Sequence, residues 1–246
     1  MKVRASTLDL SPAAKERLRA IRRTKLYDLL VAVPIIAWFV FCATLALPLV
    51  IKQVALVKLV VQTDPSVLPT SLILSCLSHI TTLVFFSVLV VMFAVRQVPQ
   101  RTALGFYPRC AAMAGTFLGV GIVLLPPQEL SSAVYLVSLL LIICGTAFAI
   151  CAGLALGRSM SILPEARRLV TSGPYAFIRH PLYLGEIVAM MGVALQYLST
   201  SALLLLGLLF IFQLQRMKNE ERVLFQVFPE YGDYMARTAR LVPGVY

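Results

Sequence analysis

The segment SGPYAFIRHPLYLGE, Ser172 to Glu186, places a dense group of polar side chains directly before a long apolar run. It holds Arg179, His180 and Glu186 in a chain whose residues are 59% hydrophobic. Pro181 suits the first turn of a helix, where the N–H that proline lacks would have no partner. The free N–H groups at such a helix start favour an anionic group. The segment therefore predicts a helix that enters a membrane with a polar site at its mouth.

The apolar run after this segment is one of several that are long enough to cross a bilayer. The mean hydropathy of the chain is +0.87, and only 13% of its residues are charged. A membrane-spanning helix needs about 20 apolar residues. Five uncharged windows have about this length or more, namely 29–51, 70–95, 110–128, 130–157 and 187–215. This composition excludes an ordinary soluble domain and predicts an all-α, polytopic helical membrane protein.

The last apolar run is too long for one crossing. Residues 181–215 would form a helix of about 52 Å, against a hydrocarbon core of about 30 Å. The polar residues Ser199–Ser201 lie near the middle of this run. We therefore expect a helical hairpin there, and about six membrane segments in total. This arrangement places 20 of the 22 Lys and Arg residues on the side of the N-terminus, so both termini are expected to be cytoplasmic.

Three parts of the chain follow from this pattern. Residues 1–26 form a basic cytoplasmic segment, residues 27–157 a four-span transmembrane region, and residues 158–246 a polar module that contains the hairpin. From Glu220 onward an amphipathic pattern predicts an interfacial cytoplasmic helix, with Tyr231 and Tyr234 at headgroup depth. The hairpin brings the polar stretches before and after it to one side of the membrane. A site built from both stretches is expected.

Other partners are disfavoured by the same sequence. The calculated isoelectric point near 9.8 comes from basic residues beside membrane spans, so no nucleic-acid partner is expected. The five cysteines form no CxxC pair, and no metal site is expected. The spacing of Arg179, Arg216 and Glu220 leaves two interpretations open. They could be positive-inside anchors with a salt-bridge partner, or they could belong to a site.

Two sequence elements resemble a known family. LVTSGPYAFIRHPLYLGE at residues 169–186 and NEERVLFQVFPEYGDYMARTARLVP at residues 219–243 occur in order on either side of the predicted hairpin. Together they resemble the isoprenylcysteine carboxyl methyltransferase family, whose wider group includes phospholipid N-methyltransferases. The resemblance covers residues 157–243, and the first four apolar windows do not contribute to it.

The resemblance implies an integral membrane enzyme that uses S-adenosylmethionine (SAM), with residues 158–246 as a cofactor-binding catalytic module. The cofactor would bind on the cytoplasmic side under the C-terminal segment, and a lipophilic or prenylated acceptor would reach it from the bilayer. Arg216 matches an acceptor-side arginine, and Arg179 belongs to the RHP element, so these two are the candidate catalytic residues. The implied cofactor contacts are Leu169, Val170, Tyr175, His180, Pro181, Leu182, Tyr183 and Glu220.

The sequence also departs from the family. Arg167 and Arg168 stand where members often have a histidine, and the acceptor-binding region is not matched. Isoprenylcysteine-type carboxyl O-methylation is the leading expectation, because a carboxylate is already ionised at neutral pH and Arg216 could orient it. An amine or thiol would have to lose a proton, and only Glu186 and Glu221 are candidate bases.

Three alternatives to carboxyl methylation remain open from the sequence. The first is N- or S-methylation of a phospholipid or a small molecule. The second is an NADPH-dependent reductase of the sterol type, which the ending LVPGVY suggests. The third is a non-enzymatic membrane scaffold. Cofactor preference separates the methyltransferases from the reductase, and absence of cofactor binding favours the scaffold.

Overall fold

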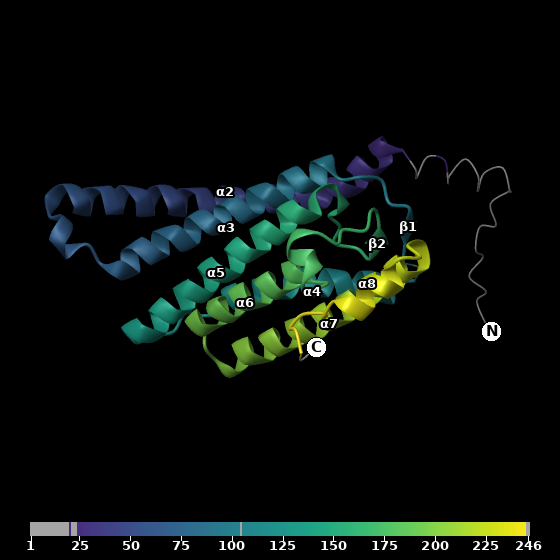
Figure 1. Cartoon of the computed structure of the whole chain (residues 1–246). Coiled ribbons are helices and arrows are strands. Elements are labelled where there is room, and N and C mark those ends of the chain that lie inside the picture. The colour runs from purple at the N-terminus through teal and green to yellow at the C-terminus, as the bar shows by residue number, and fades with distance from the viewer. Residues whose placement is uncertain (1–19, 21–23, 104, 245–246) are drawn as a thin grey trace, which may run out of the picture.

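The computed structural model describes residue 20 and residues 24–103 and 105–244, most of which are helical (Figure 1). The α-helices are α2 (Lys25–Thr63), α3 (Thr70–Val95), α4 (Tyr107–Val123), α5 (Ser132–Leu156), α6 (Pro181–Gln196), α7 (Thr200–Val227) and α8 (Tyr231–Arg237). The remaining elements are three 3₁₀ turns and two short antiparallel strands. They are η1 (Pro65–Val67), η2 (Gly157–Ser159), η3 (Gly173–Ala176), β1 (Arg101–Thr102) and β2 (Glu165–Ala166).

Among the described residues, four helical stretches are long and apolar enough to cross a membrane. They are Lys25–Thr63, Thr70–Val95, Ser132–Ser159 and Thr200–Val227. Helix α6 is apolar but shorter, with 16 residues. The prediction of a mostly helical chain with several membrane-spanning helices is confirmed.

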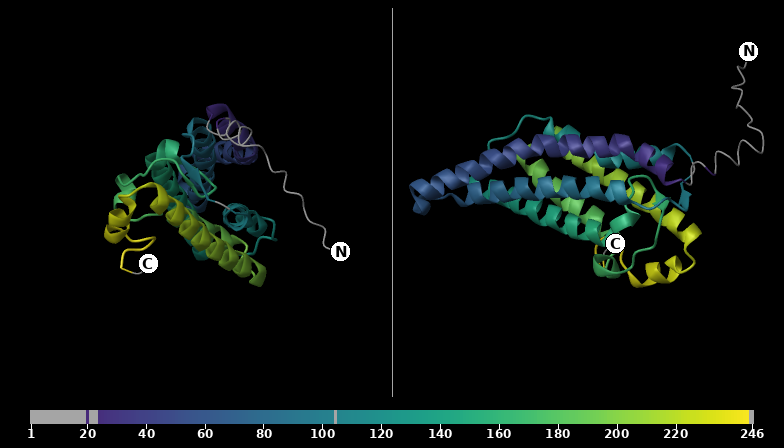
Figure 2. Two further views of the ribbon diagram at one scale, coloured as in Figure 1. Left: turned by 90° about the vertical axis from the view of Figure 1, so that its right-hand side faces the viewer. Right: turned by 90° about the horizontal axis from the view of Figure 1, so that it is seen from above.

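The helices pack in pairs, with α2 against α3, α4 against α7, and α5 against α6. Figure 1 shows that the α2–α3 pair projects beyond the other helices at the end away from β1. The left view in Figure 2 places α7 (green to yellow) and α8 (yellow) across the bundle from the start of α2 (purple). Helices α5 and α6 approach closely at glycines, as is common between membrane helices. A Cβ atom on Gly185 would lie 2.7 Å from the backbone N of Ala149, and one on Gly145 would lie 2.4 Å from that of Ala189.

Helix α7 corrects one prediction. Its start agrees with the polar break, since the Ser199 side chain accepts a hydrogen bond from the backbone N–H of Ala202. The prediction that a separate helix begins near Glu220 is wrong, because α7 continues to Val227. No glycine or proline interrupts the chain between Thr200 and Pro229 except Gly207, and the buried Met217 anchors the late turns against the bundle.

The expected interfacial helix is reduced to α8, which has seven residues. Its two tyrosines do not face outward, as the amphipathic pattern had suggested. Tyr231 is 1% exposed and Tyr234 is 5% exposed, so both pack inside the protein. The reason is that α8 folds back onto the loop before α6, where the Tyr234 hydroxyl donates a hydrogen bond of 2.7 Å to the carbonyl oxygen of Tyr175.

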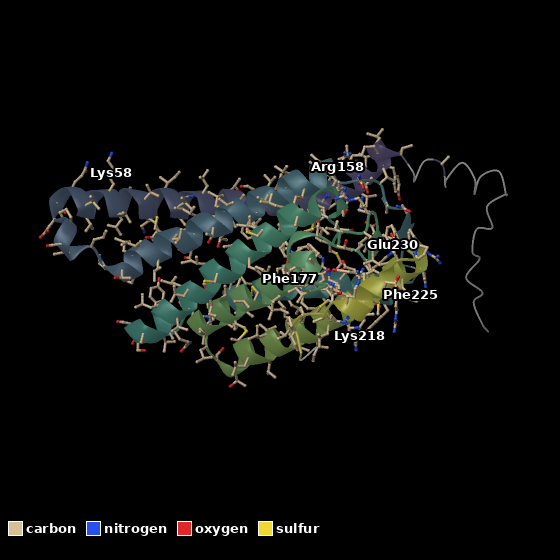
Figure 3. The ribbon with its side chains drawn as sticks, viewed as in Figure 1. Lys58, Arg158, Phe177, Lys218, Phe225 and Glu230 are labelled. Carbon is tan, nitrogen blue, oxygen red and sulfur yellow. The ribbon has the colours of Figure 1, made fainter. Side chains whose placement is uncertain are left out.

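We call the end of the bundle that carries β1, β2 and α8 the polar end. Figure 3 shows Arg158, Lys218 and Glu230 near this end, whereas Lys58 lies at the opposite end. A buried ion-pair network joins the N-terminal helix to the loops there. Asp28 at the start of α2 lies 3.0 Å from both the Arg96 and the Arg167 guanidinium, and Arg167 lies 2.6 Å from Glu165. The polar end is therefore fixed by contacts between distant parts of the sequence.

Candidate functional site

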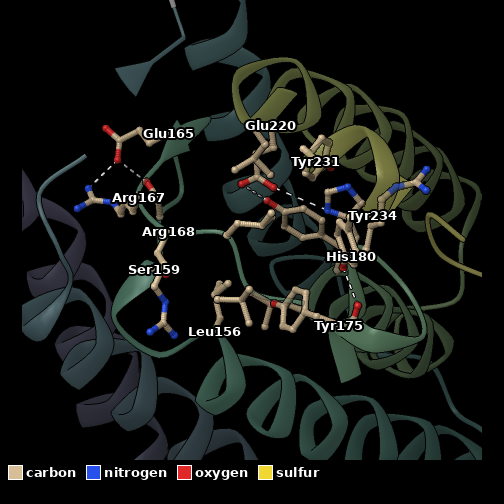
Figure 4. Close-up of a pocket in the computed structure, with 17 residues that line it drawn as sticks. Leu156, Ser159, Glu165, Arg167, Arg168, Tyr175, His180, Glu220, Tyr231 and Tyr234 are labelled. Carbon is tan, nitrogen blue, oxygen red and sulfur yellow. Dashed lines mark hydrogen bonds and ion pairs between the residues drawn. The ribbon is translucent and has the colours of Figure 1, made fainter. Parts of the chain in front are cut away.

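The first compartment of the site is a pocket at the polar end, with a free volume of about 80 Å³ (Figure 4). It lies between the loop that follows α5, the start of α6, the end of α7, and α8. The residues that line it are Leu156, Ser159, Ser161, Glu165, Arg167, Arg168, Leu169, Val170, Tyr175, Arg179, His180, Leu182, Tyr183, Glu220, Leu224, Tyr231 and Tyr234. We call it the cofactor pocket, because most of the residues that the sequence resemblance implies as cofactor contacts line it.

Glu220 is the carboxylate that borders this pocket from α7. The Tyr183 hydroxyl donates a hydrogen bond of 2.8 Å to its Oε1 atom. The Nδ1 atom of His180 lies 3.8 Å from its Oε2 atom, and the His180 ring stacks on the Tyr183 ring at 5.4 Å between centroids. A carboxylate held in this way suits an ammonium group, because charge-assisted hydrogen bonds are the strong ones.

Glu221 faces a different group of partners from its neighbour. Its carboxylate lies 2.9 Å from Arg179 Nε, 2.6 Å from Arg240 Nη2 and 3.2 Å from His180 Nε2. Arg179 also donates to the carbonyl oxygens of Met235 and Thr238. We call this cluster the Glu221 clamp. It ties the C-terminal segment to the start of α6, so Arg179 supports the pocket through its contacts with this segment.

The start of α6 differs in one respect from the expected anion site. The backbone N–H groups of Arg179 and His180 are bonded to the carbonyl oxygens of Ala239 and Arg240, at 2.8 and 3.1 Å. They are not open to a ligand. The first turn of a helix still leaves N–H groups without intrahelical partners, and here these belong to Leu182 and Tyr183.

Tyr175 of η3 and Tyr234 of α8 line the pocket where these two elements meet. Burial raises the pKa of Tyr234 to about 12, and it also raises the pKa of Tyr175 above its usual range. Both hydroxyls therefore keep their protons at physiological pH. The Tyr234 hydroxyl remains a donor to the Tyr175 carbonyl, which holds α8 over η3.

The second compartment is a larger cavity of about 310 Å³ within the helix bundle. We call it the membrane cavity. Aromatic and aliphatic side chains from α2, α3, α4, α5, α6 and α7 form most of its wall. They include Trp38, Phe39, Phe85, Phe86, Leu89, Phe93, Val120, Val123, Ile142, Met190, Val193 and Leu209. Polar side chains that also border it are Thr82, Thr116, Thr146, Glu186, Gln213 and Arg216.

Arg216 lies where the two compartments meet. Its guanidinium borders the membrane cavity and stacks over the Tyr183 ring, 4.7 Å from the centroid. It donates hydrogen bonds of 3.3 Å to Thr116 Oγ1 and 3.4 Å to the carbonyl oxygen of Ser161. The Tyr183 hydroxyl is the one bonded to Glu220 in the cofactor pocket. A single ring thus separates the acidic group of one compartment from the basic group of the other.

A short backbone segment forms a wall between the compartments. Ser159 and Ser161 border the cofactor pocket, whereas Met160 and Ile162 border the membrane cavity. Alternate residues of an extended chain point to opposite sides. The sequence SMSI therefore presents a polar face to one compartment and an apolar face to the other.

The structure brings most of the predicted site residues together. Seven of the eight expected cofactor residues border the cofactor pocket, and so does Arg179. These seven are Leu169, Val170, Tyr175, His180, Leu182, Tyr183 and Glu220. Pro181 is buried in the first turn of α6 and does not border the pocket, and Arg216 borders the membrane cavity instead.

Several pocket residues were missed by the sequence reasoning. They are Leu156, Ser159, Ser161, Glu165, Leu224, Tyr231 and Tyr234. The last three lie within the amphipathic pattern after Glu220, which was assigned to the membrane interface. The first four carry no local signal, because contacts with distant residues place them there. Within the described part of the chain, no three His, Cys, Asp or Glu residues are grouped as they would be to hold a metal ion.

The fold and the site define a helical membrane protein with a polar pocket that adjoins an apolar cavity inside its bundle. Residues 133–231 match the model of the phospholipid methyltransferase family. This range includes α6, α7 and nearly all of α5.

Two curated proteins are similar over a shorter stretch. The cobalt-zinc-cadmium resistance protein CzcN of Cupriavidus metallidurans is 36% identical over 76 residues, which cover 30% of this chain and 35% of that protein. The nickel-cobalt-cadmium resistance protein NccN of Alcaligenes xylosoxydans xylosoxydans is 34% identical over 80 residues, which cover 32% of this chain and 38% of that protein. The chain thus spans little more than a third of the length of these relatives.

Proposed function

We propose that the protein is a membrane-embedded, SAM-dependent methyltransferase that acts on a lipophilic acceptor. The observation that carries this proposal is the meeting of the two compartments at Tyr183 and Arg216. One compartment is polar and carries a carboxylate, and the other is apolar and lies inside the bundle. The match of residues 133–231 to the phospholipid methyltransferase family supports the same chemistry.

The residues of the cofactor pocket suit SAM. Glu220 would pair with its ammonium group, and the open N–H groups of Leu182 and Tyr183 would receive its carboxylate. The buried Ser159 Oγ has no hydrogen-bond partner among the described residues and offers a further polar contact. When bound, SAM supplies an electrophilic methyl group on a sulfonium, and the electron pair of the methyl–sulfur bond stays on sulfur.

The cofactor pocket has to widen before it can hold SAM. Its free volume of about 80 Å³ is below the range of about 300–1,000 Å³ that is usual for ligand pockets. Tyr231 and Tyr234 form one side of it, and the Glu221 clamp holds the chain that follows them. The proposal therefore includes an outward movement of α8 and the C-terminal segment on binding.

The membrane cavity would receive the acceptor. Its volume of about 310 Å³ and its aromatic wall suit an apolar chain, and Arg216 lies close to the cofactor pocket. Isoprenylcysteine-type carboxyl O-methylation would use Arg216 to orient a carboxylate. N- or S-methylation of a phospholipid or a small molecule would instead use Glu186, which borders the same cavity. In both cases the protein aligns the reactants and excludes water.

The proposal also includes a topology. Helices α4 and α6 would act as membrane segments beside the four longer ones, which gives six segments with both termini in the cytoplasm. Helix α6 is about 24 Å long, so it would enter the bilayer from the cytoplasmic side without spanning its full thickness.

A transfer assay tests the proposed activity. Membranes that contain the protein would be incubated with SAM labelled on its methyl group and with a total lipid extract. We expect label to move into the organic phase with the wild-type protein, and transfer to fall to background with Glu220→Gln. Equal transfer by both proteins would contradict the proposal.

A further inference from the structure

Glu186 is a partly buried carboxylate that the proposed cofactor site does not use. It lies in the second turn of α6 and borders the membrane cavity. The Nε2 atom of Gln213 on α7 donates a hydrogen bond of 3.0 Å to its Oε2 atom. An ionisable side chain inside a membrane protein is costly and usually serves a ligand or ion pathway. Because Glu186 borders the membrane cavity, the ligand that it serves would be the molecule bound in that cavity.

The polar groups around Glu186 leave specific hydrogen-bonding positions open. Gln213 is 2% exposed, and its Oε1 atom has no hydrogen-bond partner among the described residues. The bond from Nε2 to Glu186 fixes the orientation of this amide, since an amide oxygen would not face a carboxylate. Arg216 is 3% exposed, and its Nε atom also has no partner within the described chain. Glu186 Oε1 likewise accepts no hydrogen bond from any described residue.

Three polar atoms therefore have no partner among the described residues: the acceptors Glu186 Oε1 and Gln213 Oε1, and the donor Arg216 Nε, of which the last two are enclosed by protein atoms. Buried polar groups are nearly always satisfied in proteins, so a ligand or water has to supply the missing partners. The other two carboxylates of the region face other groups. Glu220 accepts from Tyr183 on the side of the cofactor pocket, and Glu221 belongs to the clamp.

We propose that Glu186 binds the head group of the acceptor and receives its proton. The acceptor is then a lipophile with a proton-bearing head group, such as an amine, thiol or hydroxyl, and not a carboxylate. A carboxylate could pair with Arg216, but it would place a second negative charge beside Glu186 and would offer no donor to the two unpaired acceptors. This inference rests on the proposed methyltransferase function, and it reverses the acceptor chemistry expected from the sequence.

The proton transfer accounts for the charge of the acceptor. The heteroatom of the head group needs a free electron pair to attack the methyl group, and a protonated amine has none. An ammonium therefore gives up a proton before the bond to the methyl group forms, whereas a thiol or hydroxyl gives it up before or as that bond forms. The bond between the heteroatom and hydrogen breaks, and its electron pair stays on the heteroatom. The proton moves to Glu186 Oε1, which becomes a neutral carboxylic acid. Gln213 stays bonded to Oε2 and holds the group in place.

The assignment of Glu186 can be tested by measuring how model acceptors bind to the cofactor-free protein, with tryptophan fluorescence as the signal. Trp38 is the only tryptophan in the sequence, and it borders the membrane cavity. Its fluorescence would be followed in nanodiscs during titration with dodecylamine, dodecanol or dodecanoate, which share one chain length. We expect the amine and the alcohol to bind at least about tenfold more tightly than the carboxylate, about 1.4 kcal/mol.

Two variants and a control make the test specific. Glu186→Gln keeps the shape of the side chain, and we expect the preference for amine over carboxylate to fall below about threefold. Gln213→Met removes the open amide oxygen and should weaken amine and alcohol binding while leaving some preference. Glu129→Gln changes an exposed glutamate between α4 and α5 and should behave as wild type.

The outcomes separate this inference from the function on which it rests. Equal or tighter binding of dodecanoate by the wild type, or an unchanged preference in Glu186→Gln, would overturn the assignment of Glu186. S-adenosylhomocysteine affinity, measured on the same samples, reports on the cofactor pocket and on folding. Normal affinity together with a lost preference in Glu186→Gln supports the inference. If the wild-type protein prefers the amine over the carboxylate but does not bind S-adenosylhomocysteine, the methyltransferase proposal is contradicted instead.

Discussion

The Tyr183 hydroxyl, in the first turn of α6, donates a hydrogen bond of 2.8 Å to the Glu220 carboxylate near the end of α7. This bond joins the two polar stretches that lie 37 residues apart in the sequence. The face of the same ring receives the Arg216 guanidinium at 4.7 Å. One side chain therefore touches the acidic group of the cofactor pocket and the basic group of the membrane cavity.

Replacing Glu220 tests the cofactor pocket. Glu220→Gln keeps the hydrogen bond to Tyr183 possible but removes the charge that would pair with an ammonium group. A hydrogen bond to a charged group contributes about 1.5–3 kcal/mol, so we expect S-adenosylhomocysteine to bind at least about tenfold more weakly. Isothermal titration calorimetry measures the effect. Glu230→Gln, at an exposed position after α7, is the matched control and should bind normally. Unchanged affinity in Glu220→Gln would remove this residue from the pocket assignment.

Replacing Arg216 tests the boundary between the compartments. Arg216 borders the membrane cavity and not the cofactor pocket, so Arg216→Ala should reduce turnover about 100-fold through misplacement of the acceptor. Its S-adenosylhomocysteine affinity should change far less. Arg216→Lys keeps the charge but cannot donate in a fork to Thr116 and Ser161, so it should restore only part of the activity. Normal turnover in Arg216→Ala would contradict its role at the acceptor.

The Glu221 clamp predicts a different phenotype from that of its neighbour. Glu221 and Arg179 are both largely buried, and Glu221→Ala leaves Arg179 without its carboxylate. Removal of one partner of a buried ion pair typically costs about 3–5 kcal/mol. We expect residues 228–244 to exchange backbone hydrogen for deuterium faster in the ligand-free variant. In Glu220→Gln the same segment should keep wild-type exchange. Equal exchange in Glu221→Ala and wild type would show that the clamp does not hold the C-terminal segment.

Because α5 and α6 pack closely at Gly185, we expect that adding a single methyl group at this position lowers the stability of the protein. In Gly185→Ala the added Cβ would meet backbone atoms of α5 at 2.7 Å, which the helices can relieve only by moving apart. We expect a cost of about 1–3 kcal/mol and a lower thermal midpoint in detergent. Gly207→Ala is the matched control, since no atom lies within 4 Å of its added Cβ. A lower midpoint in the control, or none in Gly185→Ala, would contradict the packing account.

Site residues that are placed by local sequence signals could be predicted from the sequence. Those that are placed by contacts with distant residues could not. Pro181 and the polar group before it marked the start of α6, because the relevant signals are local. The end of α7 was misjudged, since the charge of Glu220 and Glu221 suggested an interface while the helix continues inside the protein. The different partners of these two adjacent glutamates follow from Tyr183 and Arg179, which precede the turn between α6 and α7.

Long-range pairing explains the remaining differences. Arg167 and Arg168 are equivalent in the sequence, yet Arg167 is 3% exposed and paired with Asp28, 139 residues away, whereas Arg168 is exposed. The alternation of polar and apolar residues in SMSI, at 159–162, could not be interpreted from the sequence, because it depends on the two compartments that lie on either side of this segment. Glu186 was recognised as a candidate base from its position in the helix. Its open hydrogen-bonding position depends on Gln213, which the sequence does not place beside it.

Calorimetric titration of the purified wild-type protein with S-adenosylhomocysteine, with NADPH as the parallel ligand, tests most directly whether the polar pocket binds SAM. We expect saturable binding of S-adenosylhomocysteine and no binding of NADPH. Binding of NADPH alone would rule out the SAM pocket and favour a reductase, and binding of neither ligand would favour a non-enzymatic scaffold.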